Sequence, residues 1–174
     1  MGLGKATLSF TVLRAQDLPE AQFPRWAVLG RSNVGKSSLL NALLHPFKMF
    51  RTGSTPGLTQ GLIGVQVRLG QSEKTTLEIV DVPGFGFALN PKRRDWEKLG
   101  ISLMEKANDQ PLMWLWLVEA SREPDELDRE VAKWLGTQLF KIVFTKADRI
   151  SKNKRQSLEK KWQDFVQRSA EASV

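Results

Sequence analysis

The sequence contains no cysteine and a single histidine, His45, among its 174 residues. The missing cysteines exclude disulfide bonds, cysteine–zinc sites and thiol nucleophiles. One histidine cannot build a histidine metal cluster. The longest apolar stretch, Leu112 to Val118, is too short to cross a membrane. The opening MGLGKATLSF lacks the apolar core of a signal peptide. We therefore expect a cytoplasmic protein with no membrane segment.

The composition is otherwise that of one globular domain, with 41% hydrophobic and 26% charged residues. The charge is uneven. The 26 basic and 19 acidic residues give a net charge of +7, and positions 141 to 174 hold nine basic and four acidic residues, or +5. A smaller basic run lies at Lys92–Arg94. Such patches attract polyanions, nucleic acid above all, although a solvated helix face explains the same charge.

Apolar segments alternate with longer amphipathic ones, which predicts an α/β fold with a mostly parallel sheet and helices on both of its faces. The expected strands are Trp26–Leu29, Leu62–Leu69, Thr75–Val80, Leu112–Val118 and Leu139–Phe144. Leu62–Leu69 alternates as an edge or antiparallel strand does. Helical stripes of apolar residues run from Trp96 to Ala107, from Leu127 to Leu135 with Pro124 in the first turn, and from Leu158 to Ser169. We expect their aromatic residues to lie in the core.

Positions 30 to 37 read GRSNVGKS, a complete G-x-x-x-x-G-K-S motif. The glycines allow a tight turn whose backbone N–H groups point at phosphate oxygens. A helix that we expect from Lys36 to Leu44 presents its positive end to the same anion. Lys36 would reach the β- and γ-phosphates, and the Ser37 hydroxyl would bind Mg²⁺. The motif therefore predicts nucleotide binding.

Two further motifs each begin directly after a predicted strand. Asp81-Val82-Pro83-Gly84 offers a carboxylate to Mg²⁺ through water and a backbone N–H to a γ-phosphate. Thr145-Lys146-Ala147-Asp148 lies at the carboxyl edge of the sheet, where Asp148 can accept two protons that guanine has and adenine lacks. Within the long loop from His45 to Gly61, the segment Thr52–Gly61 would be switch I in a GTPase, where Thr55 or Thr59 would close on Mg²⁺ and the γ-phosphate.

Together, GRSNVGKSSL, TPGLTQ, DVPGFGFA and TKAD resemble the EngB family of bacterial GTPases, in the Era/TrmE-like branch of translation-associated G proteins. The resemblance implies a Ras-like P-loop G domain that binds GTP, GDP and Mg²⁺ and hydrolyses GTP slowly. It also implies a role in assembling the large ribosomal subunit, and an association with cell division and septation. The basic segments would be candidates for contacting ribosomal RNA.

The resemblance implies a role for each motif residue. Ser37 and Thr59 become the direct magnesium ligands, with Asp81 acting through water, and Lys36, Thr59 and Gly84 take the catalytic roles. The nucleotide contacts are Gly30, Arg31, Ser32, Asn33, Val34, Gly35, Lys36, Ser37, Ser38, Gly57, Leu58, Thr59, Gln60, Gly61, Asp81, Val82, Pro83, Gly84, Thr145, Lys146, Ala147 and Asp148.

Three features of the sequence bear on catalysis and on the extent of the fold. Phe85 stands where Ras-like enzymes place a glutamine that orients the attacking water, which predicts weak intrinsic hydrolysis. Asn33 stands where potassium-dependent relatives coordinate a cation, so K⁺ is a candidate cofactor, and a purely structural role for Asn33 is the alternative. No apolar strand-like run follows the last helical stripe, so the family's final strand and helix are expected to be missing.

We expect one monomeric domain, with an extension over about 1–22, a motif-bearing core over 23–150 and a basic helix over 151–174. Two other functions stay open. One is a nucleotide-dependent or degenerate module that binds RNA or protein without productive GTP turnover. The other is a P-loop ATPase or small-molecule kinase, against which TKAD and the threonine-bearing loop argue.

Overall fold

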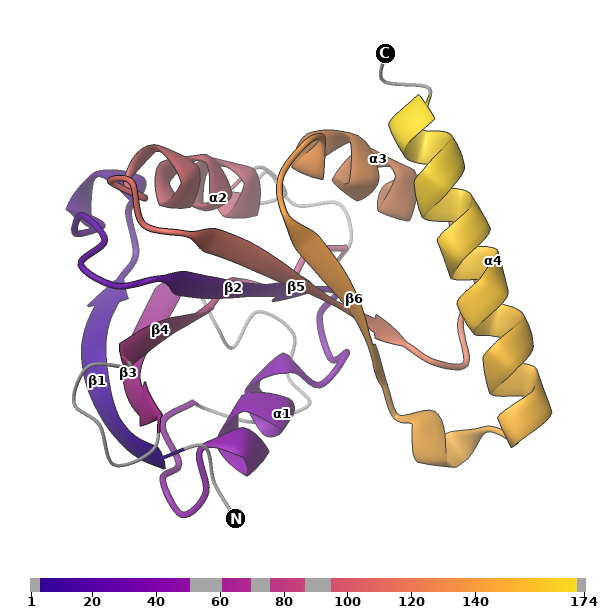
Figure 1. Ribbon diagram of the computed structural model, residues 1–174, viewed down its shortest axis with the longest axis horizontal. Helices are drawn as coiled ribbons and strands as arrows, with labels where there is room; N and C mark the ends of the chain where they lie inside the picture. Colours follow the sequence, from indigo (N-terminus) through magenta and orange to yellow (C-terminus); the bar gives the residue numbers. More distant parts are fainter. Residues whose placement is uncertain (1–3, 51–60, 70–75, 87–94, 172–174) are drawn as a thin grey trace.

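The computed structural model describes residues 4–50, 61–69, 76–86 and 95–171. Its six strands form one sheet in the order β1-β3-β4-β2-β5-β6 (Figure 1). The strands are β1 (Gly4–Val12), β2 (Arg25–Gly30), β3 (Leu62–Leu69), β4 (Thr76–Asp81), β5 (Leu112–Glu119) and β6 (Phe140–Thr145). The β2–β4, β2–β5 and β5–β6 pairs are parallel, and the β1–β3 and β3–β4 pairs are antiparallel. The predicted α/β class and mostly parallel sheet are confirmed.

The strand β1 is a correction to the sequence analysis, which expected only an extension before residue 23. β1 pairs with β3 along its whole length and places β3 inside the sheet rather than at its edge. The register shifts between Leu8 and Phe10, so Ser9 forms a β-bulge. Phe10 then lies opposite Gly64, where a Cβ atom would be 2.4 Å from the phenylalanine ring. The ring therefore covers the glycine of β3.

In the described part of the chain, helices cover both faces of the sheet (Figure 1). They are α1 (Lys36–Leu43), α2 (Asp95–Glu105), α3 (Glu126–Leu135) and α4 (Lys152–Glu171), and short 3₁₀ turns occupy Ala15–Asp17 and Ala147–Arg149. One apolar cluster joins α1 to one face through Leu40 and Val28. The other joins α2, α3 and α4 to the opposite face, with Leu103, Val131 and Trp162 in contact with the central strands.

The predicted helical stripes are confirmed, with two differences at their ends. Trp162 is fully buried, and Trp134 and Phe165 are half-buried against the core, as expected of the aromatic residues in these stripes. α2 ends at Glu105, before the last residue of its predicted stripe. Pro124 precedes the N-cap Asp125 of α3 instead of lying in the first turn, because the Asp125 carboxylate accepts the first free N–H groups of the helix.

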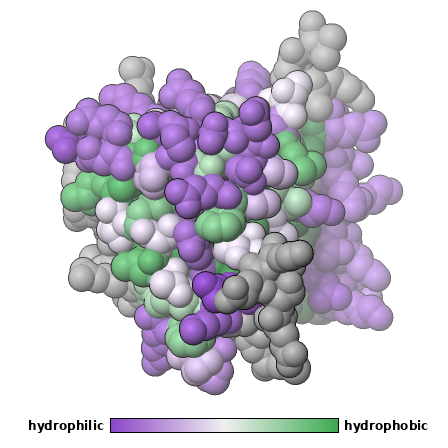
Figure 2. Space-filling model, turned by 60° about the vertical axis from the view of Figure 1, so that its left-hand side comes forward, coloured by the Kyte–Doolittle hydropathy of each residue, from purple (hydrophilic) through white to green (hydrophobic). Residues whose placement is uncertain are grey.

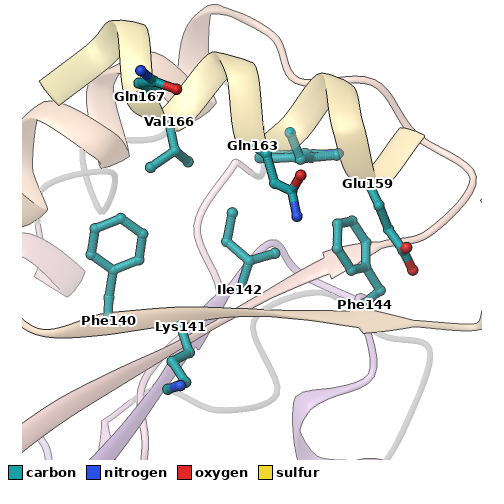
Figure 3. Close-up of a pocket in the computed structure, with 9 residues that line it drawn as sticks. Phe140, Lys141, Ile142, Phe144, Glu159, Gln163, Val166 and Gln167 are labelled. Carbon is teal, nitrogen blue, oxygen red and sulfur yellow. The ribbon is translucent and has the colours of Figure 1, made fainter. Parts of the chain in front are cut away.

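α4 and the edge strand β6 enclose a groove of about 470 Å³ (Figure 3). Phe140, Ile142 and Phe144 of β6 face α4 across it, and Val166 lines the helix side. After β6, the described residues contain a 3₁₀ turn and α4 but no further strand. At the opposite edge, hydrophilic residues surround scattered apolar ones (Figure 2). Within the described part of the chain, no helix combines the length and the apolar character that a membrane crossing requires.

Candidate nucleotide-binding site

The loop between β2 and α1 contains the predicted phosphate-binding motif, and we call it the phosphate loop. β2 ends at Gly30 and α1 begins at Lys36. A Cβ atom at Gly30 would lie 2.7 Å from the carbonyl oxygen of Leu117 in β5, so the close approach requires glycine. Gly35, the N-cap of α1, and Asn33 have left-handed φ angles of 107° and 63°. The chain thus turns sharply into α1, and the loop ends on the positive N-terminal end of that helix.

Lys36 folds its side chain back over this loop. Its Nζ donates to the carbonyl oxygens of Gly30 at 3.2 Å and Arg31 at 3.5 Å. The side chain is buried, and burial lowers the pKa of Lys36 against the opposing effect of the Asp81 carboxylate. The lysine amine is therefore held among backbone carbonyls at the position where the motif binds phosphate.

Ser37 and Asp81 form the second part of the site. The Ser37 hydroxyl, in the first turn of α1, donates to Oδ2 of Asp81 at the end of β4 at 3.0 Å. Asp81 is fully buried, and burial raises its pKa to about 6, opposed by Lys36 and by the Ser37 hydrogen bond.

The donor set of this pair fits a hydrated Mg²⁺ ion. Oδ1 of Asp81 has no hydrogen-bond partner among the described residues. The hydroxyl and carboxylate oxygens are ligands that Mg²⁺ accepts. In the part of the chain that the structure describes, no three acidic or histidine side chains gather into a metal site, so phosphate and water would complete the coordination.

The segment after β4 lies against the phosphate loop. The Ser32 N–H donates to the Phe85 carbonyl at 3.0 Å, and the Phe85 N–H donates to the Gly30 carbonyl at 3.3 Å. A Cβ atom at Gly84 would lie 2.9 Å from the Ser32 nitrogen and 3.0 Å from Nζ of Lys36. The Phe85 ring packs in the core and offers no polar group to a water molecule.

The end of β6 is hydrogen-bonded to the phosphate loop. The Thr145 hydroxyl donates to the Val34 carbonyl at 2.8 Å. Lys146, in a left-handed conformation with a φ of 54°, donates through Nζ to Oε2 of Glu119 at 2.8 Å. That hydrogen bond lowers the pKa of the Glu119 carboxyl. Asp148 is exposed in the 3₁₀ turn that follows β6. Its carboxylate is therefore accessible at the carboxyl edge of the sheet, where the phosphate loop also lies.

The remaining predicted residues divide into two groups. Thr55, Gly57, Leu58, Thr59, Gln60 and the basic run Lys92–Arg94 lie outside the described residues. Gly61 is buried, and a Cβ atom there would lie 2.0 Å from the Val12 carbonyl oxygen. Val34 and Val82 are buried, Pro83 and Ala147 are half-buried, and Asn33 and Ser38 are exposed.

Sequence reasoning missed the position of the Arg31 side chain. Its contact with a nucleotide stays a prediction, and the structure shows that its guanidinium pairs with Asp125 at the start of α3. Asp125 and Asp128 form a capping box in which each side chain accepts the backbone N–H of the other. The D-x-x-D spacing after Pro124 was the available signal for the start of this helix.

The chain is similar to known GTP-binding proteins. Residues 25–146 match the family described as 50S ribosome-binding GTPase. The chain is 36% identical to the probable GTP-binding protein EngB of Desulfotalea psychrophila, covering 88% of this chain and 78% of that protein. It is also 35% identical to the probable GTP-binding protein EngB of Ligilactobacillus salivarius, covering 91% of this chain and 80% of that protein.

Solved structures with the same fold include two of Era. Era from Aquifex aeolicus bound to GDP.AlF4- has a TM-score of 0.63 and 21% identity, covering 83% of this chain and 48% of that one. Era in complex with MgGDPNP and nucleotides 1506–1542 of 16S ribosomal RNA has a TM-score of 0.62 and 19% identity. The match covers 87% of this chain and 48% of that one. These likenesses indicate the fold, and the extended matches to sequence relatives establish that the chain belongs to the EngB family of GTP-binding proteins.

Proposed function

We propose that this chain is a switch that binds GTP and GDP together with Mg²⁺ and hydrolyses GTP slowly. The observation that supports this most is the hydrogen bond from Thr145, at the end of β6, to Val34 in the phosphate loop. Because Asp148 follows Thr145 closely and Lys36 follows the phosphate loop, one nucleotide can contact both residues.

Each motif then has a chemical task. Lys36 binds the β- and γ-phosphates, and the Gly84 N–H binds the γ-phosphate. Ser37 holds Mg²⁺ directly and Asp81 holds it through water, while Thr59 supplies the second direct ligand. When bound, Mg²⁺ neutralises charge on the phosphates.

Base selection rests on the loop after β6. The Asp148 carboxylate accepts the N1–H and the N2 amino protons of guanine, and adenine offers neither. The stem of Lys146 covers the base, in the orientation that its hydrogen bond to Glu119 favours.

Hydrolysis is slow because Phe85 cannot orient a water molecule. Asn33 is a candidate ligand for K⁺, which would supply positive charge near the phosphates. Comparing steady-state turnover in potassium and sodium buffers tests this role, and equal rates would exclude it.

The proposed partner is the large ribosomal subunit or one of its assembly intermediates, bound in the cytoplasm by a monomer. The family description as ribosome-binding GTPases supports this partner. The basic helix α4 and Lys92–Arg94 are the candidate contacts to ribosomal RNA. Effects on cell division and septation would follow from impaired translation.

The core position of Phe85 favours one alternative, a module that binds RNA or protein without GTP turnover. Measured turnover separates the two functions. RNA binding that is sensitive to salt and persists without nucleotide would favour the alternative.

The deciding experiment is an equilibrium titration of the protein with fluorescent GDP and with fluorescent ADP in the presence of Mg²⁺. We expect selective GDP binding that Asp148→Ala abolishes, because the variant loses both hydrogen bonds to guanine. Equal binding of GDP and ADP, or a folded protein that binds neither, would refute the proposed function.

A further inference from the structure

Arg31 lies in the phosphate loop, but its guanidinium pairs with two carboxylates of α3. Its Nη2 contacts Oδ1 of Asp125 and lies 3.6 Å from Oδ2 of Asp128. The Arg31 side chain is 27% exposed and that of Asp128 is fully buried. A buried carboxylate is stable only when cations or N–H groups pair with it, so Asp128 depends on its neighbours.

Asp128 is shared by two arginines. Arg122, in the loop after β5, donates through Nη1 to Oδ2 of Asp128 at 2.5 Å and through Nη2 to Oδ1 at 2.9 Å. The same carboxylate accepts the Asp125 N–H at 2.9 Å. The phosphate loop, the loop after β5 and the start of α3 therefore meet at one buried negative charge.

Arg122 continues this chain of contacts to α4. Its guanidinium carbon lies 5.2 Å from the ring centroid of Trp162, and the Trp162 indole N–H donates to the Arg122 carbonyl at 3.0 Å. Trp162 is fully buried and packs edge-on against Trp116 of β5. A rearrangement of Arg122 therefore changes the surroundings of this indole.

We propose that Arg31 is a positioning residue whose ion pairs with Asp125 and Asp128 hold the phosphate loop in its nucleotide-binding form, and that the shared carboxylate couples nucleotide binding to Trp162 in α4. This inference rests on the proposed function of the same site. Any shift of Arg31 alters the positive charge beside Asp128, and Arg122 responds because it pairs with the same carboxylate oxygen, Oδ2 of Asp128. Nucleotide binding and the conformation of α4 are then linked in both directions.

Asp125→Asn tests the pairing without disturbing the helix start, because asparagine is as good an N-cap as aspartate. We expect the affinity for fluorescent GDP to fall about fivefold, at the lower end of typical coupling between sites. The matched control is Asp17→Asn, which removes the exposed ion pair with Arg14 and should leave GDP binding unchanged. If Arg31 instead acts by binding phosphate directly, Asp125→Asn frees its guanidinium, and unchanged or tighter GDP binding would overturn the proposal.

Arg31→Gln, alone and combined with Asp125→Asn, gives a second test. Both substitutions break the ion pair between Arg31 and Asp125, and Asp125→Asn also removes the charge that lies 3.5 Å from Nη1 of Arg122. If the Arg31 pair carries the effect on binding, the double variant should bind GDP as Arg31→Gln does, within about twofold. Effects that multiply would mean that the two side chains act separately, which contradicts the proposed pair.

The coupling to α4 can be followed separately by NMR, through the ¹H–¹⁵N signal of the Trp162 indole. This signal is assigned by its absence from the spectrum of Trp162→Phe. In the wild-type protein we expect GDP to shift this signal, and in Asp125→Asn we expect the shift at GDP saturation to fall by half or more. A wild-type protein that binds GDP without moving the signal, or a shift that is equal in Asp125→Asn, would refute the coupling alone. Absence of GDP binding by the wild-type protein would instead refute the proposed function and this inference with it.

Discussion

Gly84→Ala is the smallest substitution that should block the proposed nucleotide site. The added Cβ atom would lie 2.9 Å from both Cα and N of Ser32, and 3.0 Å from Nζ of Lys36. Ordinary contacts of this kind are about 3.5 to 4.0 Å. The phosphate loop or the chain after β4 must therefore move by several tenths of an ångström, and Lys36 must leave its position above the loop.

The free-energy cost follows from the nature of the neighbours. Two of the three clashing atoms belong to the backbone of the phosphate loop, which side-chain rotation cannot relieve. Overpacking in well-packed regions costs about 1–3 kcal/mol. If nucleotide binding restores the original loop geometry, this cost appears as a loss of affinity of about 5- to 150-fold for GDP and GTP.

The assay is a titration of Gly84→Ala with fluorescent GDP and with a non-hydrolysable GTP analogue, beside thermal unfolding of the nucleotide-free protein. The melting curve shows whether the variant folds, so that lost binding is not mistaken for lost structure. A folded Gly84→Ala protein that binds both nucleotides within twofold of wild type would refute the argument, because the phosphate loop would then accommodate the methyl group without penalty.

Three other predictions concern stability. Arg25 and Glu78 form a buried ion pair at 2.6 Å, with side chains 1% and 5% exposed. Arg25→Met leaves the Glu78 carboxylate buried without its cation, so it should lower the free energy of unfolding in urea by about 3–5 kcal/mol. The double variant with Glu78→Leu should recover most of this loss. Burial raises the pKa of Asp81 from 3.8 to about 6, so the folded state holds more protons than the unfolded state between these values. Relative to Asp81→Asn, the free energy of unfolding of the wild-type protein without nucleotide should thus decrease from pH 4 to pH 6. Trp162→Ala removes a fully buried side chain and should cost about 3–5 kcal/mol, measured by urea unfolding.

The parts of the molecule that follow from local sequence were predicted well. The strand ending at Gly30 and the helix starting at Lys36 match the motif, because glycine turns and a helix N-terminus depend on neighbouring residues. Parallel strands then bring the loop after β6 beside the phosphate loop, as the Thr145 hydrogen bond to Val34 illustrates. For such segments, motif order along the chain suffices to place the residues in space.

β1 was not predicted, and its bulge is the physical reason. Regular alternation would place Leu8 and Phe10 on one face with Val12, but Leu8 is 54% exposed and Val12 is buried. The extra residue, Ser9, interrupts the alternation and donates its hydroxyl to Glu78 at 2.6 Å. The β-bulge that hides the strand in the sequence thus also gives the buried Glu78 carboxylate a hydrogen-bond partner besides Arg25.

Charge pairing across the fold is the part that sequence patterns do not contain. Arg31 and Asp125 lie 94 positions apart, and Arg25 and Glu78 lie 53 apart, so no helical or strand period connects them. Each pair exists because the strand order brings the ends of separate elements together. The motif placed Arg31 in the phosphate loop correctly, yet only the position of α3 beside that loop determines where its guanidinium binds. A motif therefore predicts where a backbone goes, while the role of a long charged side chain within it depends on what the fold packs alongside.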